Sequence, residues 1–294
     1  MTKDLKAKSL GNGKWVLILF IVLPVSALIF WSALPDVAAL KHQNPAKTAF
    51  MTYRLEHSKE KKRNPQVQTW VPLSRISPYL VKAVIIAEDS KFWHHEGFDY
   101  EGIQLAIEKD FKAKKLRAGG STITQQLAKN LYLSPEKSVF RKLKEAAITL
   151  RLEQSLSKKR ILELYLNVVE WGDGIYGAEA ASRFYFSKTS NDLTPEEAAR
   201  LVAVLPNPHL YNPAGDQKYV VKRSEMIYAL MVKRGVVVPG YQEMVEPPVV
   251  GVPGAPGSAP VEAPRPPVPF PGGGSAVTPP LTSFPGTVIL SGTQ

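Results

Sequence analysis

Cysteine is missing from the 294-residue chain, so disulfide bonds, thiolate metal sites and cysteine nucleophiles are excluded. Alternating apolar and polar residues, the pattern of a half-buried strand, are scarce, and no internal repeat is evident. Negative charge is in the minority, because 26 Asp and Glu residues stand against 37 Lys and Arg residues and leave a formal net charge of +11. This balance favours an anionic partner, and nucleic acid, phospholipid headgroups and a phosphorylated substrate all meet that condition.

Charge is also missing from a run of about twenty residues, Trp15–Leu34, which is the length that a helix needs to cross a bilayer. A cleaved signal peptide is the alternative, but the apolar stretch is long and no convincing small-residue cleavage site follows it. We therefore predict a single uncleaved transmembrane helix at 15–34. The short basic segment 1–14 favours a cytoplasmic N-terminus, which places the rest of the chain outside, although basic residues after the run compete.

The C-terminal part of the chain changes composition. After about Met244, proline, glycine and small residues alternate without a periodic apolar face. Such a segment has little to bury, and its prolines cannot donate backbone hydrogen bonds. We predict a disordered Pro/Gly-rich tail at 246–294, which leaves 35–245 as the globular domain.

The central domain contains several helix start signals. Ser77 with Pro78 and Thr194 with Pro195 each combine an N-cap residue with a proline in the first turn. Amphipathic runs of helical period also follow Ser138 and Ser157. The pattern predicts an all-α domain.

Two adjacent acids stand at the end of the apolar helix that begins at Ser77. A carboxylate in a partly dry position can act as a general acid or base, and Glu88 is the better candidate. Asp89 points about 100° away around the helix, so we expect it to bond nearby backbone or histidine donors instead. The alternative is that both acids only end and solubilise the helix. His94 and His95 lack the spacing of a zinc helix, so packing or hydrogen bonding is expected of them.

A glycine pair at 119–120 precedes a run of hydroxyl and amide side chains that opens a helix. An ordinary buried helix has fewer polar side chains than this, unless it binds a polar ligand. A helix N-terminus that follows glycines also favours the binding of anions. The spacing of a nucleotide P-loop is missing. The alternative is a capped helix with a polar exposed face. The side chains concerned are Ser121, Thr122, Thr124, Gln125 and Gln126.

Basic residues and a second glutamate share the next helices. Arg141 and Glu145 lie one turn apart and can pair, with Lys142 beside them, and Lys158 opens the following helix. Taken separately, the charged residues of each helix could simply form a solvent-exposed face. Together with Glu88, they describe a cleft able to handle a proton and a phosphate.

In their order along the chain, these stretches resemble the motifs of the membrane-anchored monofunctional peptidoglycan glycosyltransferases, whose domain also occurs in bifunctional penicillin-binding proteins. The match spans about 70–213, and no transpeptidase signature follows. Two departures are mild: Ser187 stands where glycine is commoner, and Lys137 stands where an arginine often contacts phosphate. The matching segments are Glu88–Gly97, Gly119–Gln126, Arg141–Glu145, Lys158–Asn167 and Gly177–Lys188.

The resemblance implies a lysozyme-like helical glycosyltransferase domain that polymerises lipid II into β-1,4-linked glycan strands and releases undecaprenyl pyrophosphate. Glu88 would be the general base, Glu145 would lie on the donor side, and basic side chains would stabilise the departing diphosphate. It further implies the inner membrane as location, with the catalytic domain outside the cytoplasm. The substrate-binding residues that it suggests are Asp89, Phe92, His95, Gly97, Ser121, Thr122, Thr124, Gln125, Gln126, Lys129, Asn130, Lys137, Arg141, Lys142 and Lys158.

The expected partners are lipid II, the growing glycan chain and membrane lipid, and other cell-wall synthesis or division proteins stay open. No organic cofactor is expected, whereas a divalent cation, Mg²⁺ or Mn²⁺, stays open. Nucleic acid is not expected, because the basic residues accompany the catalytic motifs and no nucleic-acid module is visible. Two rival functions remain: a lysozyme-like hydrolase or lytic transglycosylase, and a non-catalytic protein that binds the cell wall.

Overall fold

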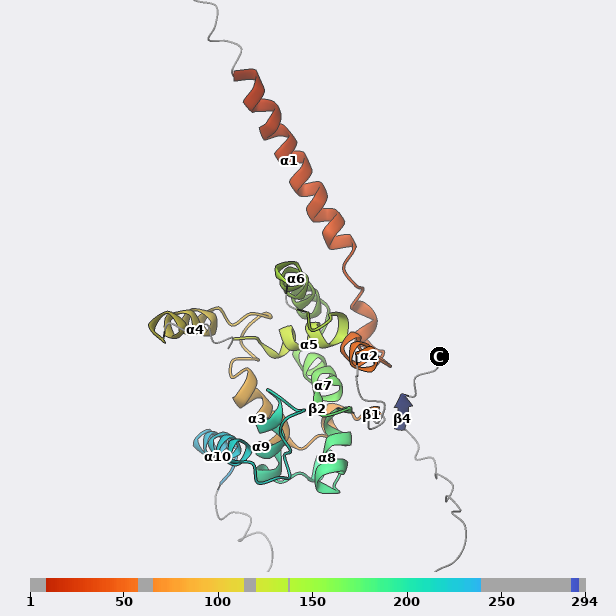
Figure 1. The fold of residues 1–294 in the computed structure, drawn as a ribbon, viewed down its shortest axis with the longest axis vertical. Helices are drawn as coiled ribbons and strands as arrows, with labels where there is room; N and C mark the ends of the chain where they lie inside the picture. Colours follow the sequence, from red (N-terminus) through yellow and green to blue (C-terminus); the bar gives the residue numbers. More distant parts are fainter. Residues whose placement is uncertain (1–8, 58–65, 114–119, 137, 239–286, 291–294) are drawn as a thin grey trace, which may run out of the picture.

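The computed structural model describes residues 9–57, 66–113, 120–136, 138–238 and 287–290 (Figure 1). The described part of the chain is mostly helical. Its helices are α1 (Ser9–Ser32), α2 (Ala49–Glu56), α3 (Pro78–Glu88), α4 (Tyr100–Ala113), α5 (Ile123–Tyr132), α6 (Val139–Ser155), α7 (Lys158–Val168), α8 (Ala178–Phe186), α9 (Pro195–Val204) and α10 (Lys218–Lys233). Short 3₁₀ turns lie at Ala38–Lys41, Leu73–Arg75 and Ser190–Asp192.

The predicted helix starts are confirmed. The Ser77 side chain accepts a hydrogen bond from the backbone N–H of Tyr79, and Pro78 is the first residue of α3. Thr194 forms a capping box with Glu197 at the start of α9. The side chains of Ser138 and Ser157 cap α6 and α7 by accepting a hydrogen bond from the backbone N–H of Arg141 and of Arg160. These helices begin where they do because the caps satisfy backbone donors that have no partner within the helix.

The core is built around α7, which lies between α5 and β1 in Figure 1. Its apolar side chains are buried, while the basic residues of its first turn, among them the exposed Lys159, keep contact with solvent, as expected of an amphipathic helix. The helix α5 contacts both α6 and α7, and α9 contacts α3 and α10. These contacts bring the end of α3, the start of α5 and one face of α10 together.

A small sheet departs from the all-α prediction. It contains β1 (Gln66–Thr69), β2 (Glu170–Gly172), β3 (Ile175–Tyr176) and β4 (Thr287–Leu290), in the order β2-β3-β1-β4. The strand β1 is parallel to β3 and antiparallel to β4. Strands of two to four residues are too short to show an alternating pattern, which explains why the sequence did not reveal them. The strand β4 also lies in the segment for which no ordered element was predicted.

At the N-terminal end, α1 projects away from the other helices (Figure 1). No helix in the described ranges is both long and apolar enough to span a membrane. The last turn of α1 is connected to α6, because Arg151 Nη1 donates to the carbonyl of Leu34 over 3.0 Å and the guanidinium lies 4.7 Å from the Trp31 ring centre. The segment 1–8 and most of the predicted tail lie outside the described residues.

Candidate active site

The carboxylate of Glu88 lies at the C-terminal end of α3, where the apolar face of that helix is buried. Its side chain is only 15% exposed. Gln126 Nε2 donates to Glu88 Oε2 over 3.0 Å, and the buried hydroxyl of Tyr165 donates to Gln126 Oε1 over 2.9 Å. Burial raises the pKa of Tyr165 well above its usual value, and the nearby charges of Glu88 and Asp89 raise it further. Tyr165 therefore remains a proton donor that fixes the orientation of the Gln126 amide.

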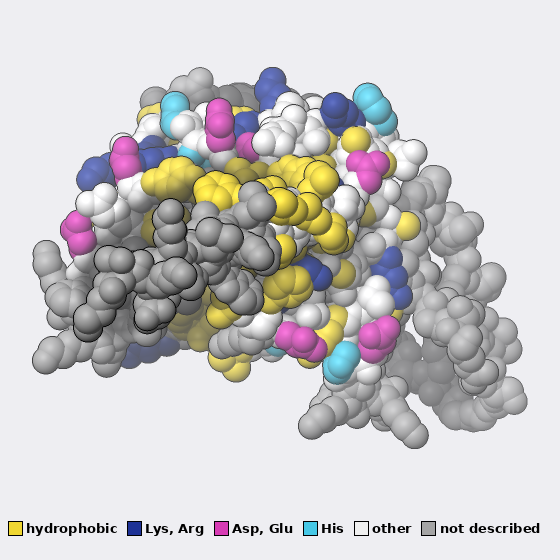
Figure 2. Space-filling view, turned by 90° about the horizontal axis from the view of Figure 1, so that it is seen from above, with side chains coloured by type: hydrophobic (Ala, Val, Ile, Leu, Met, Phe, Trp, Pro, Cys, Tyr) yellow, Lys and Arg dark blue, Asp and Glu magenta, His cyan; other side chains and the backbone are white. Residues whose placement is uncertain are grey.

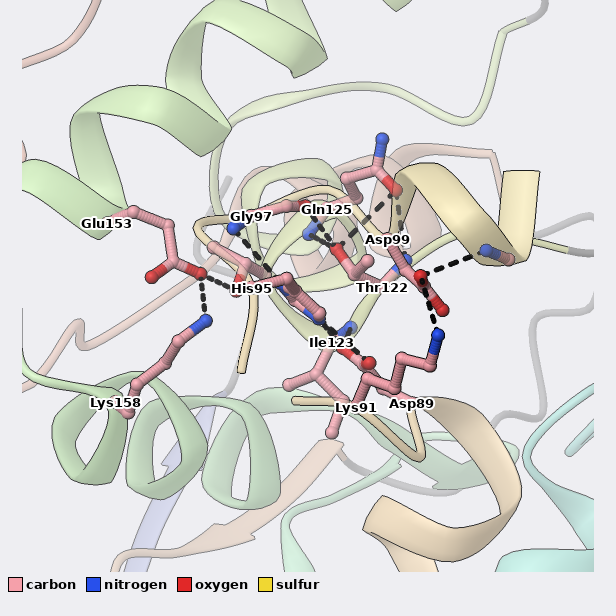
Figure 3. A network of polar contacts seen from close by, with 12 residues as sticks. Asp89, Lys91, His95, Gly97, Asp99, Thr122, Ile123, Gln125, Glu153 and Lys158 are labelled. Carbon is pink, nitrogen blue, oxygen red and sulfur yellow. Dashed lines mark hydrogen bonds and ion pairs between the residues drawn. The ribbon is translucent and has the colours of Figure 1, made fainter. Parts of the chain in front are cut away.

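Asp89 has a different environment from its neighbour. Its Oδ1 lies 2.8 Å from His95 Nε2, and its Oδ2 accepts a hydrogen bond of 2.9 Å from the backbone N–H of Ile123 (Figure 3). These partners are the backbone and histidine donors expected for this residue. Asp89 thus connects the loop after α3 to the first turn of α5, where a carboxylate also suits the helix dipole.

The loop after α3 is fixed by His95 and Gly97. His95 Nδ1 accepts a hydrogen bond of 3.1 Å from the backbone N–H of Gly97, which leaves Nε2 to donate to Asp89. Gly97 has a φ of +91°, and a Cβ there would lie 2.8 Å from Thr149 Cγ2. Phe92 is fully buried. These matched residues therefore build the loop around the catalytic candidate, and His95 has the hydrogen-bonding role predicted for it.

Most of the polar run at 121–126 is engaged within the protein. Thr122 and Gln125 form a reciprocal capping box at the start of α5. Thr124 Oγ1 donates to Glu153 Oε1 over 2.6 Å. These bonds explain three of the polar side chains without a ligand, whereas Gln126 contacts Glu88 and Ser121 is exposed.

A pocket opens beside Glu88, between the end of α3, the start of α4 and the glycine loop before α5. Ser121 lies on its wall together with the backbone of Gly120. The lining is mainly polar and includes two further acids, Asp89 and Asp99. The full lining is Ile86, Ala87, Glu88, Asp89, Ser90, Asp99, Gly102, Gly120, Ser121 and Thr122.

The second glutamate lies on α6 and is buried, with its side chain 4% exposed. Arg141 Nη1 donates to Glu145 Oε2 over 2.7 Å, and Lys142 Nζ donates to Oε1. Both carboxylate oxygens of Glu145 therefore have cationic partners. The predicted pairing of Arg141 with Glu145 is confirmed. The arrangement leaves net positive charge on this part of α6.

Lys129 lies close enough to both Glu88 and Glu145 for their charges to act on its ammonium. It is half-buried on α5, and its ammonium forms no hydrogen bond or ion pair with any described residue. Desolvation lowers the pKa of Lys129 from 10.5, and the charges of Glu145 and Glu88 act in the opposite direction. A partly desolvated ammonium without an ion-pair partner is suited to an anionic ligand. Asn130, next in the chain, is buried.

Lys158 lies in a different setting from Lys129. Its Nζ donates to Glu153 Oε1 over 2.7 Å (Figure 3). The same Nζ lies 4.7 Å from the centre of the Phe92 ring. Its charge is therefore already paired by a carboxylate that is 8% exposed. Lys137, the remaining predicted phosphate ligand, lies outside the described residues.

Two charged residues near this site were missed by the sequence reasoning. Glu153 joins α5 to α7 by accepting hydrogen bonds from Thr124 and Lys158. Arg223, on α10, lies with Nη2 3.5 Å from Glu88 Oε1. The sequence contained a weak signal for Glu153, which precedes Lys158 by five residues, but none for Arg223, which is far from Glu88 in the chain.

One group of described residues could offer three ligands to a metal ion, namely Glu170, Asp173 and His209. Arg54 Nε lies 3.5 Å from Glu170 Oε2 and the Arg54 guanidinium also bonds His209. The Arg54 charge would compete with a cation at this place. Glu145 is likewise occupied by its two basic partners.

The described domain is mostly helical, and its site combines the largely shielded Glu88 with Lys129, an ammonium that has no ion pair with a described residue. Residues 49–232 match the family described as Transglycosylase, and the chain belongs to that family. It is 45% identical over 218 residues to the biosynthetic peptidoglycan transglycosylase of Nitrosospira multiformis, covering 74% of this chain and 94% of the relative. The corresponding protein of Dechloromonas aromatica is 48% identical over 222 residues, covering 74% of this chain and 96% of the relative.

Proposed function

We propose that this protein polymerises lipid II into β-1,4-linked glycan strands for peptidoglycan synthesis, with release of undecaprenyl pyrophosphate. Membership of the transglycosylase family and the names of its relatives support a peptidoglycan substrate. The observation that carries the mechanism is the setting of Glu88, which is hydrogen-bonded through Oε2 and lies near Lys129, a cation with no ion pair to a described residue.

Glu88 acts as the general base in this proposal. It takes the proton from the 4-hydroxyl of the acceptor N-acetylglucosamine, whose oxygen forms a bond to the anomeric carbon of the donor chain. The bond from that carbon to the diphosphate oxygen breaks, and the leaving diphosphate keeps the electron pair. Attack from the opposite face inverts the centre. A positioned base contributes about 10²- to 10⁴-fold in rate.

Lys129 supplies the charge that the leaving group needs. Negative charge grows on the bridging oxygen as the bond breaks, so a half-buried ammonium binds the transition state more strongly than the ground state. Arg141 and Lys142, held by Glu145, extend this positive region along α6. Glu145 in this proposal orients the cations. A divalent ion, Mg²⁺ or Mn²⁺, at Glu145 would have to displace one of its basic partners.

The substrate's lipid also suggests where the protein works. We infer that the segment 15–34 anchors the chain in the cytoplasmic membrane, with the catalytic domain on the outer side. Most of the described apolar side chains of α1 are exposed, among them Phe20 and Leu28, and α6 exposes Val139, Phe140 and Leu143. In the view from above the molecule, hydrophobic side chains gather in a broad central patch that is surrounded by charged residues of both signs (Figure 2).

The test of the proposed function is the variant Glu88→Gln, which is nearly isosteric but cannot accept a proton at neutral pH. Wild type and variant receive labelled lipid II and, separately, purified sacculi, while circular dichroism and melting confirm the fold. We expect glycan polymer from lipid II with wild type, no soluble muropeptides from sacculi, and at least about a hundredfold lower polymerisation with the variant. Soluble muropeptides without polymer would identify a lytic enzyme instead.

A further inference from the structure

A cation from outside the five matched motifs lies against the catalytic candidate. Arg223 belongs to α10 and places Nη2 3.5 Å from Glu88 Oε1. Both side chains are largely shielded, at 24% and 15% exposure. An ion pair in such surroundings is screened less by salt than one on the open surface.

The two oxygens of Glu88 have different environments. Oε2 accepts the 3.0 Å hydrogen bond from Gln126. Oε1 is the oxygen closer to Arg223, and 3.5 Å is longer than an ordinary charged hydrogen bond. The guanidinium therefore stabilises the charge on Oε1 while leaving a lone pair for a proton from an incoming hydroxyl.

The fold holds Arg223 in this place. The helix α10 packs against α9 and α3, and it buries Val220 and Ile227 on either side of Arg223 in the sequence. Arg223 Nε is buried and has no hydrogen-bond partner among the described residues. No other described carboxylate forms an ion pair with this guanidinium, so its charge is directed at Glu88.

The other charged or titratable groups around Glu88 are few. Lys129 approaches from α5, Tyr165 from α7, and Asp89 follows Glu88 in the chain. Asp89 is engaged by His95, and Tyr165 is a neutral donor. The helix α9 packs on α3 but contributes no ion pair to Glu88 within the described part of the chain.

We propose that Arg223 is a positioning residue for the general base: it holds Oε1 of Glu88 toward the acceptor hydroxyl while Gln126 holds Oε2. This inference rests on the proposed function. Removing the guanidinium leaves Oε1 without its charged partner, so the carboxylate can leave the orientation in which it receives the proton.

The test compares kcat and KM for lipid II polymerisation at neutral pH in wild type, Arg223→Met and Arg223→Lys. We expect kcat of Arg223→Met to fall about tenfold while KM stays within about twofold, because a misplaced base slows the chemical step without removing a substrate contact. Arg223→Lys keeps the charge and should restore most of the wild-type kcat. Lys222→Met, an exposed neighbour on α10, is the matched control and should leave both constants unchanged.

Equal losses of kcat in Arg223→Met and Arg223→Lys, with a lower melting temperature in both, would show that Arg223 only supports the packing of α10. An unchanged kcat of Arg223→Met would equally overturn the inference. Melting of each variant separates a catalytic loss from unfolding. The proposed function fails on a different result, which is retention of polymerisation by Glu88→Gln.

Discussion

At the residue scale, the two lysines predicted to bind diphosphate are not equivalent. Lys129 has no ion pair with a described residue, and desolvation lowers its pKa from 10.5. Lys158 is paired with Glu153 and lies over the Phe92 ring. The spacing of both lysines matched the motifs, but the sequence could not show that one charge is already neutralised. In the structure Lys158 therefore holds the Glu153 carboxylate in place, a role that the motifs did not suggest.

We predict that Lys129→Met lowers lipid II turnover more than Lys158→Met does. Removing the Lys129 ammonium deletes transition-state stabilisation of about 2 to 4 kcal/mol, comparable to one oxyanion-hole donor, so turnover should fall by more than about thirtyfold. Loss of the paired Lys158 leaves the partner carboxylate of Glu153 buried, so its main effect should be a lower melting temperature. Parallel turnover and melting measurements distinguish the two variants. Equal losses of turnover at equal stability would contradict this division of roles.

The backbone conformation of Ser187 explains one departure of this sequence from the family motif. Ser187 ends α8 with a φ of 56°, in the left-handed region that favours glycine. That geometry explains why glycine is commoner at this place in the family motif. Here the serine adopts the same conformation, so the motif departure does not alter the path of the chain.

At the element scale, much of the helical fold was predictable because caps and apolar stripes are local signals. Ser77, Ser138, Ser157 and Thr194 cap helices as expected. The pairings between distant segments were not predictable, because a strand of two residues leaves no periodic pattern and a contact such as Arg223 with Glu88 depends on how α10 packs. The motifs located the site, whereas the packing of the helices decided which polar groups face it.

The strand β4 gives a prediction for the C-terminal end of the chain. Val67 N–H donates to the Gly174 carbonyl toward β3 over 2.9 Å, so the N–H groups of Gln66 and Gln68 point toward β4. Stopping the chain after Gly286 should therefore speed amide hydrogen exchange at 66 and 68, while the Val67 amide stays protected as an internal control. Four paired residues at a sheet edge contribute little net stability, so melting should fall by no more than about 4 °C.

Turnover of lipid II in detergent should not change in this shortened chain, because β4 lies on the far side of β1 from the site helices in Figure 1. Unaltered exchange at 66 and 68 would show that β4 does not pair with β1 in solution. A tenfold loss of turnover would instead show that the sheet supports the site.

At the scale of the whole molecule, the positive charge and the apolar surfaces point to one arrangement. The end of α1 is joined to α6 through Arg151, and Phe30 of α1 contacts Phe140 of α6 with ring centres 6.0 Å apart. The exposed apolar side chains of α6 therefore lie near the base of α1. The net charge of +11 suits a surface that carries anionic headgroups and a lipid diphosphate.

This arrangement predicts that α1 matters for activity only where the substrate is held in a bilayer. A chain that begins at Ala33 keeps the buried Leu34 and the whole catalytic domain. In detergent it should polymerise lipid II within about twofold of the full chain. In liposomes its rate should fall at least about tenfold, because anchoring raises the effective concentration of enzyme at the substrate. Replacing residues 15–30 with an alternating leucine and alanine helix restores an anchor without the native side chains, and should restore the liposome rate. Equal rates of the full and shortened chains in liposomes would contradict the anchoring role of α1.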